Sequence, residues 1–136
     1  MMRFVLYLVL VLGAVGKTFA ETSDSGVPMT AQAMKSELFG IRVSGVELES
    51  GDRWSECIEP GGRTLYEIGD FQSEGHLEIS AKQEACFTYP SGTSCFRVQR
   101  AGEGYMLSGS GHDGGFYLAS TVERGIRSCF ASELVG

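Results

Sequence analysis

The stretch Cys86-Phe-Thr-Tyr-Pro-Ser-Gly-Thr-Ser-Cys95 decides the fold of this chain, because it holds two strand-like segments and the turn between them. Aromatic residues alternate with polar ones on both sides of Pro90-Ser-Gly92, a pattern typical of a β-hairpin. Alternation places Phe87 and Phe96 on the buried face and both cysteines on the wetter face. Since proline cannot adopt the positive φ of the usual two-residue hairpin turns, we expect a four-residue loop over residues 90–93 that pairs Phe87 with Phe96. A three-residue loop, the alternative, would place the cysteines on opposite faces.

The cysteine count points to disulfides rather than to a metal site. The chain has four cysteines, an even number, spaced too widely for the Cys-x2-Cys pairs of zinc sites. In the four-residue loop Cys86 and Cys95 are diagonal neighbours, ~7–8 Å apart, which is at the limit for a bridge. We favour Cys86–Cys95 with some local distortion, and Cys57–Cys129 as its complement, although three connectivities are open to four cysteines.

The N-terminus has the features of an export signal over residues 1–20. Arg3 gives the positive start, an apolar run follows to about Val15, and Thr18-Phe-Ala20 supplies small residues before a cut at Glu21. The run is shorter than the ~20 apolar residues that a membrane span needs, so a retained anchor is the weaker alternative. We therefore expect a periplasmic or extracellular protein that is not inserted in the membrane after cleavage, with disulfides formed in an oxidising compartment.

The remainder of the chain divides into a flexible segment, residues 21–29, and one domain, residues 30–136. Thr30 is a candidate N-cap for a short helix that ends near Gly40. After Gly40 the apolar period changes to two, and glycine-rich breaks separate short strands. We count eight or nine strands, at residues 41–44, 54–57, 64–68, 76–79, 85–89, 95–98, 104–107, 116–119 and 126–130. The predicted fold is all-β: an antiparallel meander that forms a small closed or partly open barrel with one short N-terminal helix.

A set of short motifs between residues 31 and 110 resembles a known group of proteins. They are Gly40-Ile-Arg-Val-Ser-Gly45, Trp54-Ser-Glu-Cys-Ile-Glu-Pro-Gly-Gly-Arg-Thr64, Cys86-Phe-Thr-Tyr89 and Cys95-Phe-Arg-Val98. The chain is similar to small exported bacterial proteins of unknown function with the pattern W-x-E, P-D-G-T, C-F-x-Y and C-Y-x-V. Cys57 replaces an aromatic residue of that pattern, and Cys129 lies outside it. The resemblance implies a lipocalin-like or calycin-like barrel and a Cys86–Cys95 bridge, and it brings no catalytic residue or cofactor.

Charge and motifs exclude several function classes. The net charge is −6, and loss of Arg3 and Lys17 with the signal makes the domain more acidic, which disfavours nucleic acid and anionic membrane surfaces. Gly109-Ser-Gly-His-Asp-Gly114 fits G-x-G-x-x-G, but a strand-like segment follows it where a dinucleotide site needs a helix. His112 with Asp113 is interpreted as part of a solvated loop, and His76 as a surface residue. We predict no catalytic, cofactor-binding or metal-binding residue.

The aromatic residues are the remaining candidates for function, either as core or as the wall of a ligand pocket. Those singled out are Trp54, Tyr66, Phe87, Phe96 and Tyr105. With strands of about five residues, we favour an interior filled by side chains over a hollow one. The leading hypothesis is a non-enzymatic binding module for a small apolar ligand or an envelope protein. The alternatives are an exported inhibitor of a hydrolase such as lysozyme, acting through residues 108–115, and, with least support, an enzyme. The sequence does not indicate an oligomeric state.

Overall fold

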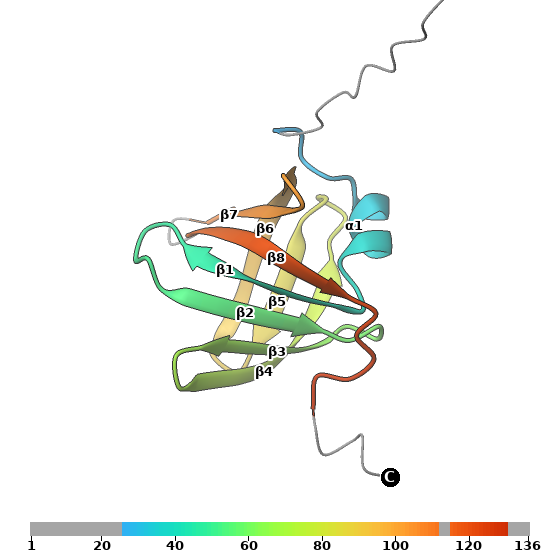
Figure 1. Ribbon diagram of the computed structural model, residues 1–136. Helices are drawn as coiled ribbons and strands as arrows, with labels where there is room; N and C mark the ends of the chain where they lie inside the picture. The colour runs from blue at the N-terminus through green and yellow to red at the C-terminus, as the bar shows by residue number, and fades with distance from the viewer. Residues whose placement is uncertain (1–25, 112–114, 131–136) are drawn as a thin grey trace, which may run out of the picture.

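The alternating sequence after Gly40 folds into eight antiparallel strands in a computed structural model that describes residues 26–111 and 115–130 (Figure 1). Each strand pairs with the next along the chain, and β8 pairs with β1, so the barrel is closed. This confirms the predicted all-β meander, and of the two predicted forms, a closed or a partly open barrel, the structure has the closed one. The strands are β1 (Ile41–Glu47), β2 (Arg53–Ile58), β3 (Arg63–Ile68), β4 (Phe71–Ile79), β5 (Ala85–Tyr89), β6 (Gly92–Ala101), β7 (Gly104–Gly109) and β8 (Phe116–Arg124).

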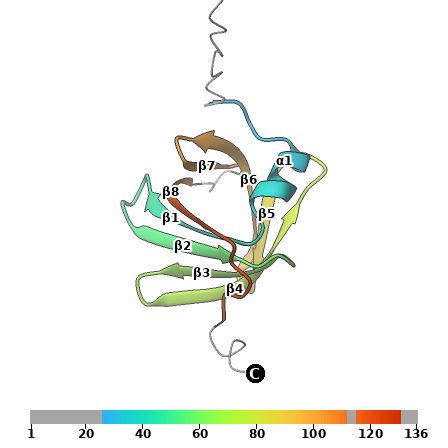
Figure 2. The same ribbon diagram turned by 45° about the vertical axis from the view of Figure 1, so that its right-hand side comes forward.

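The helix α1 (Ala31–Glu37) covers one end of the barrel, opposite the β1–β2 and β3–β4 hairpins (Figures 1 and 2). It begins as the sequence predicts, with the Thr30 hydroxyl accepting a hydrogen bond of 3.2 Å from the backbone nitrogen of Ala33. Its apolar face buries Met34 completely. At its last turn Glu37 forms an ion pair with Arg100 and accepts a hydrogen bond of 3.1 Å from the hydroxyl of Tyr105. These contacts lower the pKa of Glu37, chiefly through Arg100, and fix the helix to the barrel wall.

The folded domain begins earlier than the sequence predicts. Pro28 forms an isolated antiparallel bridge with Gln99, and the nitrogen of Met29 donates a hydrogen bond of 2.7 Å to the carbonyl of Val98. Met29 is buried in the core. The sequence predicts a flexible segment here because polar residues and a proline precede the helix. The end of β6 extends beyond its pairing with β5, however, and its free backbone groups provide both residues with partners.

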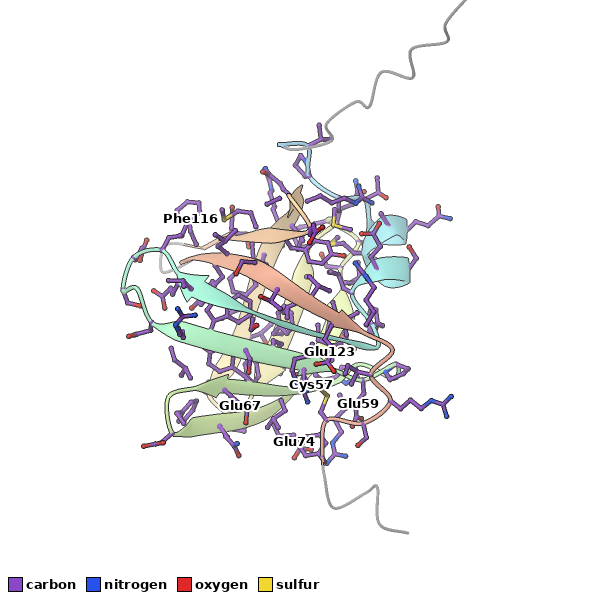
Figure 3. The ribbon with its side chains drawn as sticks, in the orientation of Figure 1. Cys57, Glu59, Glu67, Glu74, Phe116 and Glu123 are labelled. Carbon is purple, nitrogen blue, oxygen red and sulfur yellow. A yellow bond between two sulfur atoms is a disulfide. The ribbon has the colours of Figure 1, made fainter. Side chains whose placement is uncertain are left out.

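The ninth predicted strand, residues 126–130, is absent, which corrects the upper strand count. Once β8 has paired with β1, neither of these two strands has a free edge on which a following strand could form. The segment instead crosses the outside of the barrel beside β2, where Glu59 accepts a hydrogen bond of 3.0 Å from the backbone nitrogen of Cys129. Cys129 forms a disulfide with Cys57, and Figure 3 shows Cys57 and Glu59 where this segment passes.

The β5–β6 hairpin has a shorter turn than predicted. Tyr89 pairs with Gly92, so Pro90 and Ser91 alone form the loop, and Cys86 lies directly opposite Cys95 with the Cα atoms 4.0 Å apart. Our four-residue loop, with Phe87 opposite Phe96, is therefore wrong. The positive φ that proline cannot adopt falls on Gly92, at 137°, outside the two loop residues. The predicted faces are retained, because the Cys86–Cys95 disulfide lies outside and Phe87 is buried.

Two disulfides in a chain of this size indicate an oxidising compartment, since such bonds are rare in the reducing cytosol. Within the described part of the chain, no helix has the length and apolar character needed to cross a membrane.

The barrel interior changes character along its axis. The half beneath α1 is filled by side chains, of which the largest fully buried apolar ones are Met34, Ile41, Ile58, Leu77 and Val98. Alternate hairpins of a meander lie at the same end, so the β1–β2, β3–β4 and β5–β6 turns surround the other half. That second half is hollow, and the expectation of an interior filled throughout is wrong for it.

Candidate functional site

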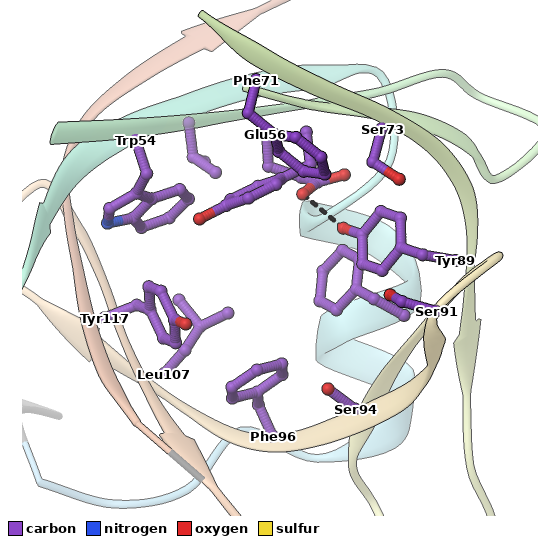
Figure 4. A pocket seen from close by; sticks show the side chains of 13 residues that line it. Trp54, Glu56, Phe71, Ser73, Tyr89, Ser91, Ser94, Phe96, Leu107 and Tyr117 are labelled. Carbon is purple, nitrogen blue, oxygen red and sulfur yellow. Dashed lines mark hydrogen bonds between the residues drawn. The ribbon is translucent and has the colours of Figure 1, made fainter. Parts of the chain in front are cut away.

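A cavity of about 190 Å³ occupies the half of the barrel farther from α1 (Figure 4). Strands contribute all of its wall except Ser91, which comes from the β5–β6 turn. Inward positions supply the lining because side chains of a strand alternate between its two faces. The lining residues are Val43, Trp54, Glu56, Tyr66, Phe71, Ser73, Phe87, Tyr89, Ser91, Ser94, Phe96, Leu107 and Tyr117.

Aromatic rings in contact form most of the wall. Trp54 meets Tyr117 edge to face at 5.5 Å between ring centroids, and Phe96 meets Tyr117 in the same way at 5.6 Å. Phe87 continues the series, 6.0 Å from Phe96. Such edge-to-face pairs hold one another in orientation, so the rings keep the cavity open instead of collapsing into it. Phe71 lines the opening with 59 % of its surface exposed.

Glu56 is the single carboxylate among the described lining residues, and it is only 4 % exposed. Its Oε2 accepts a hydrogen bond of 2.6 Å from the hydroxyl of Tyr89, drawn as the dashed line in Figure 4. Its Oε1 is buried and has no hydrogen-bond partner among the described residues. The hydroxyl of Thr64 lies close enough to influence the pKa of both groups, but it makes no hydrogen bond of ordinary geometry.

Gly75 makes this pair possible. A Cβ atom at position 75 would lie 2.5 Å from the ring of Tyr89 and 2.5 Å from the carbonyl oxygen of Thr88. The Tyr89 ring thus occupies the space that a side chain on β4 would otherwise fill. From there its hydroxyl reaches across the interior to Glu56.

Burial sets the protonation of the polar groups in the cavity. Desolvation raises the pKa of Glu56 to about 7, even though the hydrogen bond from Tyr89 favours the charged form. Desolvation also raises the pKa values of Tyr66, Tyr89 and Tyr117. Near neutral pH, therefore, the phenols are neutral and Glu56 can be either a carboxylate or a carboxylic acid.

Four of the five aromatic residues predicted as candidates line the cavity: Trp54, Tyr66, Phe87 and Phe96. Tyr105 does not, because it is buried at the helix end, where its hydroxyl accepts a hydrogen bond of 2.8 Å from Arg124. The four cysteines also lie outside the cavity. His76 packs beside Gly62 on the outer face. His112 and Asp113 lie outside the described residues, as do the centre of the glycine-rich 109–114 motif and of the 108–115 loop, and the 1–20 signal.

Glu56 is the candidate site residue that the sequence did not predict. A signal existed, because Glu56 shares a strand face with Trp54, and a carboxylate on the apolar face of a strand is unusual. Its hydrogen bond with Tyr89, which lies 33 residues away in the chain, is not apparent from the sequence.

The described residues contain one cluster of three side chains with metal-ligand atoms close together, Glu84, Cys86 and Cys95. The two sulfurs are joined in a disulfide, so neither is a thiolate that could bind a metal.

The cavity can enclose an apolar group and offer it one buried carboxyl group at its far end. This arrangement is typical of ligand recognition, in which apolar walls give affinity and few polar groups give orientation. Comparison of the chain with models of protein families, with curated proteins and with solved structures finds no match.

Proposed function

We propose that this chain is an exported binding protein whose cavity holds a small, mainly apolar molecule about the size of one substituted ring. The observation that carries the proposal is the cavity of about 190 Å³ between contacting aromatic rings. An apolar protein cavity of about 150 Å³ is enough to bind benzene. The cavity thus has room for a ring with a short substituent.

The polar groups in the lining support recognition rather than chemistry. They are one carboxyl group, the indole N–H of Trp54, which is buried without a partner among the described residues, three tyrosines with raised pKa values and three serines. The described lining contains no histidine, cysteine or second carboxylate to pair with Glu56 as an acid and base. We therefore favour a binding module over an enzyme.

Export supports the same function. Residues 1–20 have the pattern of a secretory signal, and both disulfides require oxidising conditions. We place the mature protein in the periplasm or outside the cell. A rigid barrel closed by disulfides suits a protein that carries or captures small molecules there, because a preformed cavity loses little entropy on binding.

The test uses Trp54, the one tryptophan of the chain, as a reporter inside the cavity wall. Benzyl alcohol is titrated into the disulfide-intact protein while Trp54 fluorescence is recorded, with calorimetry as the second measurement. We expect a saturable change in both.

Two variants locate the binding. Ser94→Phe places a ring in the cavity and should abolish the saturable signal. Thr93→Phe, one residue earlier on the outer face, where Thr93 contacts Thr88, should leave it intact. Binding that survives Ser94→Phe, or the absence of any saturable binding to the unmodified protein, would contradict the proposal.

A further inference from the structure

We infer that the ligand is a small organic cation, an amine attached to one ring or to a compact apolar group, whose ammonium is held by Glu56 and the surrounding aromatic faces. The inference rests on the proposed function, since it names the ligand class of the same cavity. It follows from three observations: the hydrogen bonding of Glu56, the aromatic lining, and the charges at the opening.

The carboxyl group of Glu56 has one oxygen without a hydrogen bond of ordinary geometry, although the hydroxyl of Thr64 lies nearby and is itself unpaired. Tyr89 satisfies Oε2, while Oε1 is left buried and unpaired. A buried acceptor without a partner is destabilising, and more so when it is charged. An ammonium has three N–H donors and a positive charge, so it removes this cost and favours the carboxylate form.

The lining excludes an anionic ligand and suits a cation. No arginine or lysine is among the described lining residues, so a carboxylate or phosphate would meet Glu56 without any compensating charge. The wall instead presents Trp54, Phe87 and Phe96. Aromatic faces attract ammonium groups, tryptophan most strongly, and cages of aromatic rings are a known means of binding such groups.

The loops around the opening of the cavity carry negative charge, which attracts a cation. The described loops at this end hold Glu49 and Asp52 between β1 and β2, and Asp70 between β3 and β4. These loops contain no basic residue, and Arg53 follows directly at the start of β2. Burial chiefly raises the pKa of Tyr66 in the cavity wall, and the carboxylates of Glu47 and Asp52 add to this rise. Acidic groups around an apolar opening raise the local concentration of cations and their association rate.

Benzylamine and benzyl alcohol test the inference, since they are nearly isosteric and differ in charge. Binding of each is measured by calorimetry at about pH 8, where Glu56 is mostly ionised, and at about pH 5.5, with benzoate as the anionic counterpart. At the higher pH we expect benzylamine to bind about tenfold or more tightly than benzyl alcohol, and benzoate not to bind. A tenfold preference is the size of one hydrogen bond to a charged group.

Glu56→Gln should remove the preference, so that the amine and the alcohol bind with similar affinity, and its circular dichroism spectrum shows whether the variant is folded. Glu78→Gln, an exposed position on β4, is the matched control and should change neither affinity. In the unmodified protein the preference should weaken at the lower pH, a readout that needs no variant.

Equal affinities for the amine and the alcohol, or an amine preference that survives in Glu56→Gln, would overturn the cationic ligand and leave the proposed function standing. Failure of both compounds to bind the unmodified protein would overturn both.

Discussion

The hydroxyl of Tyr89 on β5 donates a hydrogen bond of 2.6 Å to Oε2 of Glu56 on β2, so two strands that are not neighbours are joined across the barrel interior. The bond lies where the filled half of the barrel meets the hollow half. It lets a carboxyl group remain buried beside apolar walls, and Gly75 provides the space for the ring that makes it. The pair gives the cavity its one directional feature.

Tyr89→Phe should raise the pKa of Glu56 further above its ordinary value, because the lost hydrogen bond favours the carboxylate. It should also lower the free energy of unfolding by about 1–3 kcal/mol, the cost of an unpaired buried group. The carbon-13 shift of the Glu56 carboxyl, followed with pH, measures the first effect. Tyr117→Phe, in the same cavity but without a bond to Glu56, is the control. An unchanged or lower pKa in Tyr89→Phe would show that the bond does not act on Glu56.

Glu56→Gln should change how stability depends on pH. The pKa of Glu56 is raised in the folded protein to about 7 from 4.5, so the folded state binds the proton more tightly than the unfolded state. This contribution is fully present below about pH 4.5 and is lost as pH rises toward about 7, on the order of 3 kcal/mol in all. Relative to the unmodified protein, Glu56→Gln should therefore gain stability over that range. Urea unfolding followed by Trp54 fluorescence measures the difference, and a difference independent of pH would refute the prediction.

Strand alternation predicted most of the barrel wall, because period-two patterns depend on local geometry alone. The face of β5 that carries Phe87 and the outward face that carries Cys86 both follow from it. The same rule failed for residues 126–130, since alternation cannot show that β8 is already paired with both β7 and β1. The four-residue β5–β6 turn is wrong because Gly92, which takes the positive φ, is already paired with Tyr89 and so leaves only Pro90 and Ser91 in the loop.

The cavity lay beyond prediction for a different reason. Whether rings fill a barrel or line it depends on contacts between strands, such as the edge-to-face pair of Trp54 and Tyr117. It also depends on small residues at inward positions, where Ser73 and Ser94 leave space. The sequence indicates that each of these residues faces inward. The volume left empty between them depends on how all the lining side chains pack together.

Removal of Cys57–Cys129 should destabilise the protein more than removal of Cys86–Cys95. The first closes a loop with a sequence separation of 72 residues and the second one of 9. Chain entropy gives about 4 kcal/mol for the long loop and about 3 kcal/mol for the short one. Paired alanine substitutions, compared by urea unfolding, measure the two losses.

The long-loop variant should also release the segment around Cys129, which lies against Glu59. Hydrogen exchange of the backbone amide at position 129 should then accelerate, while exchange in β5 stays slow. Equal losses in the free energy of unfolding for the two pairs would mean that the length of the loop that a disulfide closes does not determine how much it stabilises this protein.

Barrel closure should depend on Gly45 more than on any side chain near the seam. The register between β1 and β8 shifts between Ser44 and Gly45, and a Cβ at position 45 would lie 1.6 Å from the carbonyl oxygen of Leu118. No rotamer relieves a clash with backbone, so Gly45→Ala must push β1 from β8 and should cost about 3 kcal/mol or more. Gly61→Ala, where a Cβ meets nothing within 4 Å, should change stability by about 0.5 kcal/mol or less. Thermal unfolding separates the two variants. Similar midpoints would show that the seam between β1 and β8 can widen at little cost, and that the barrel is held closed by its filled half alone.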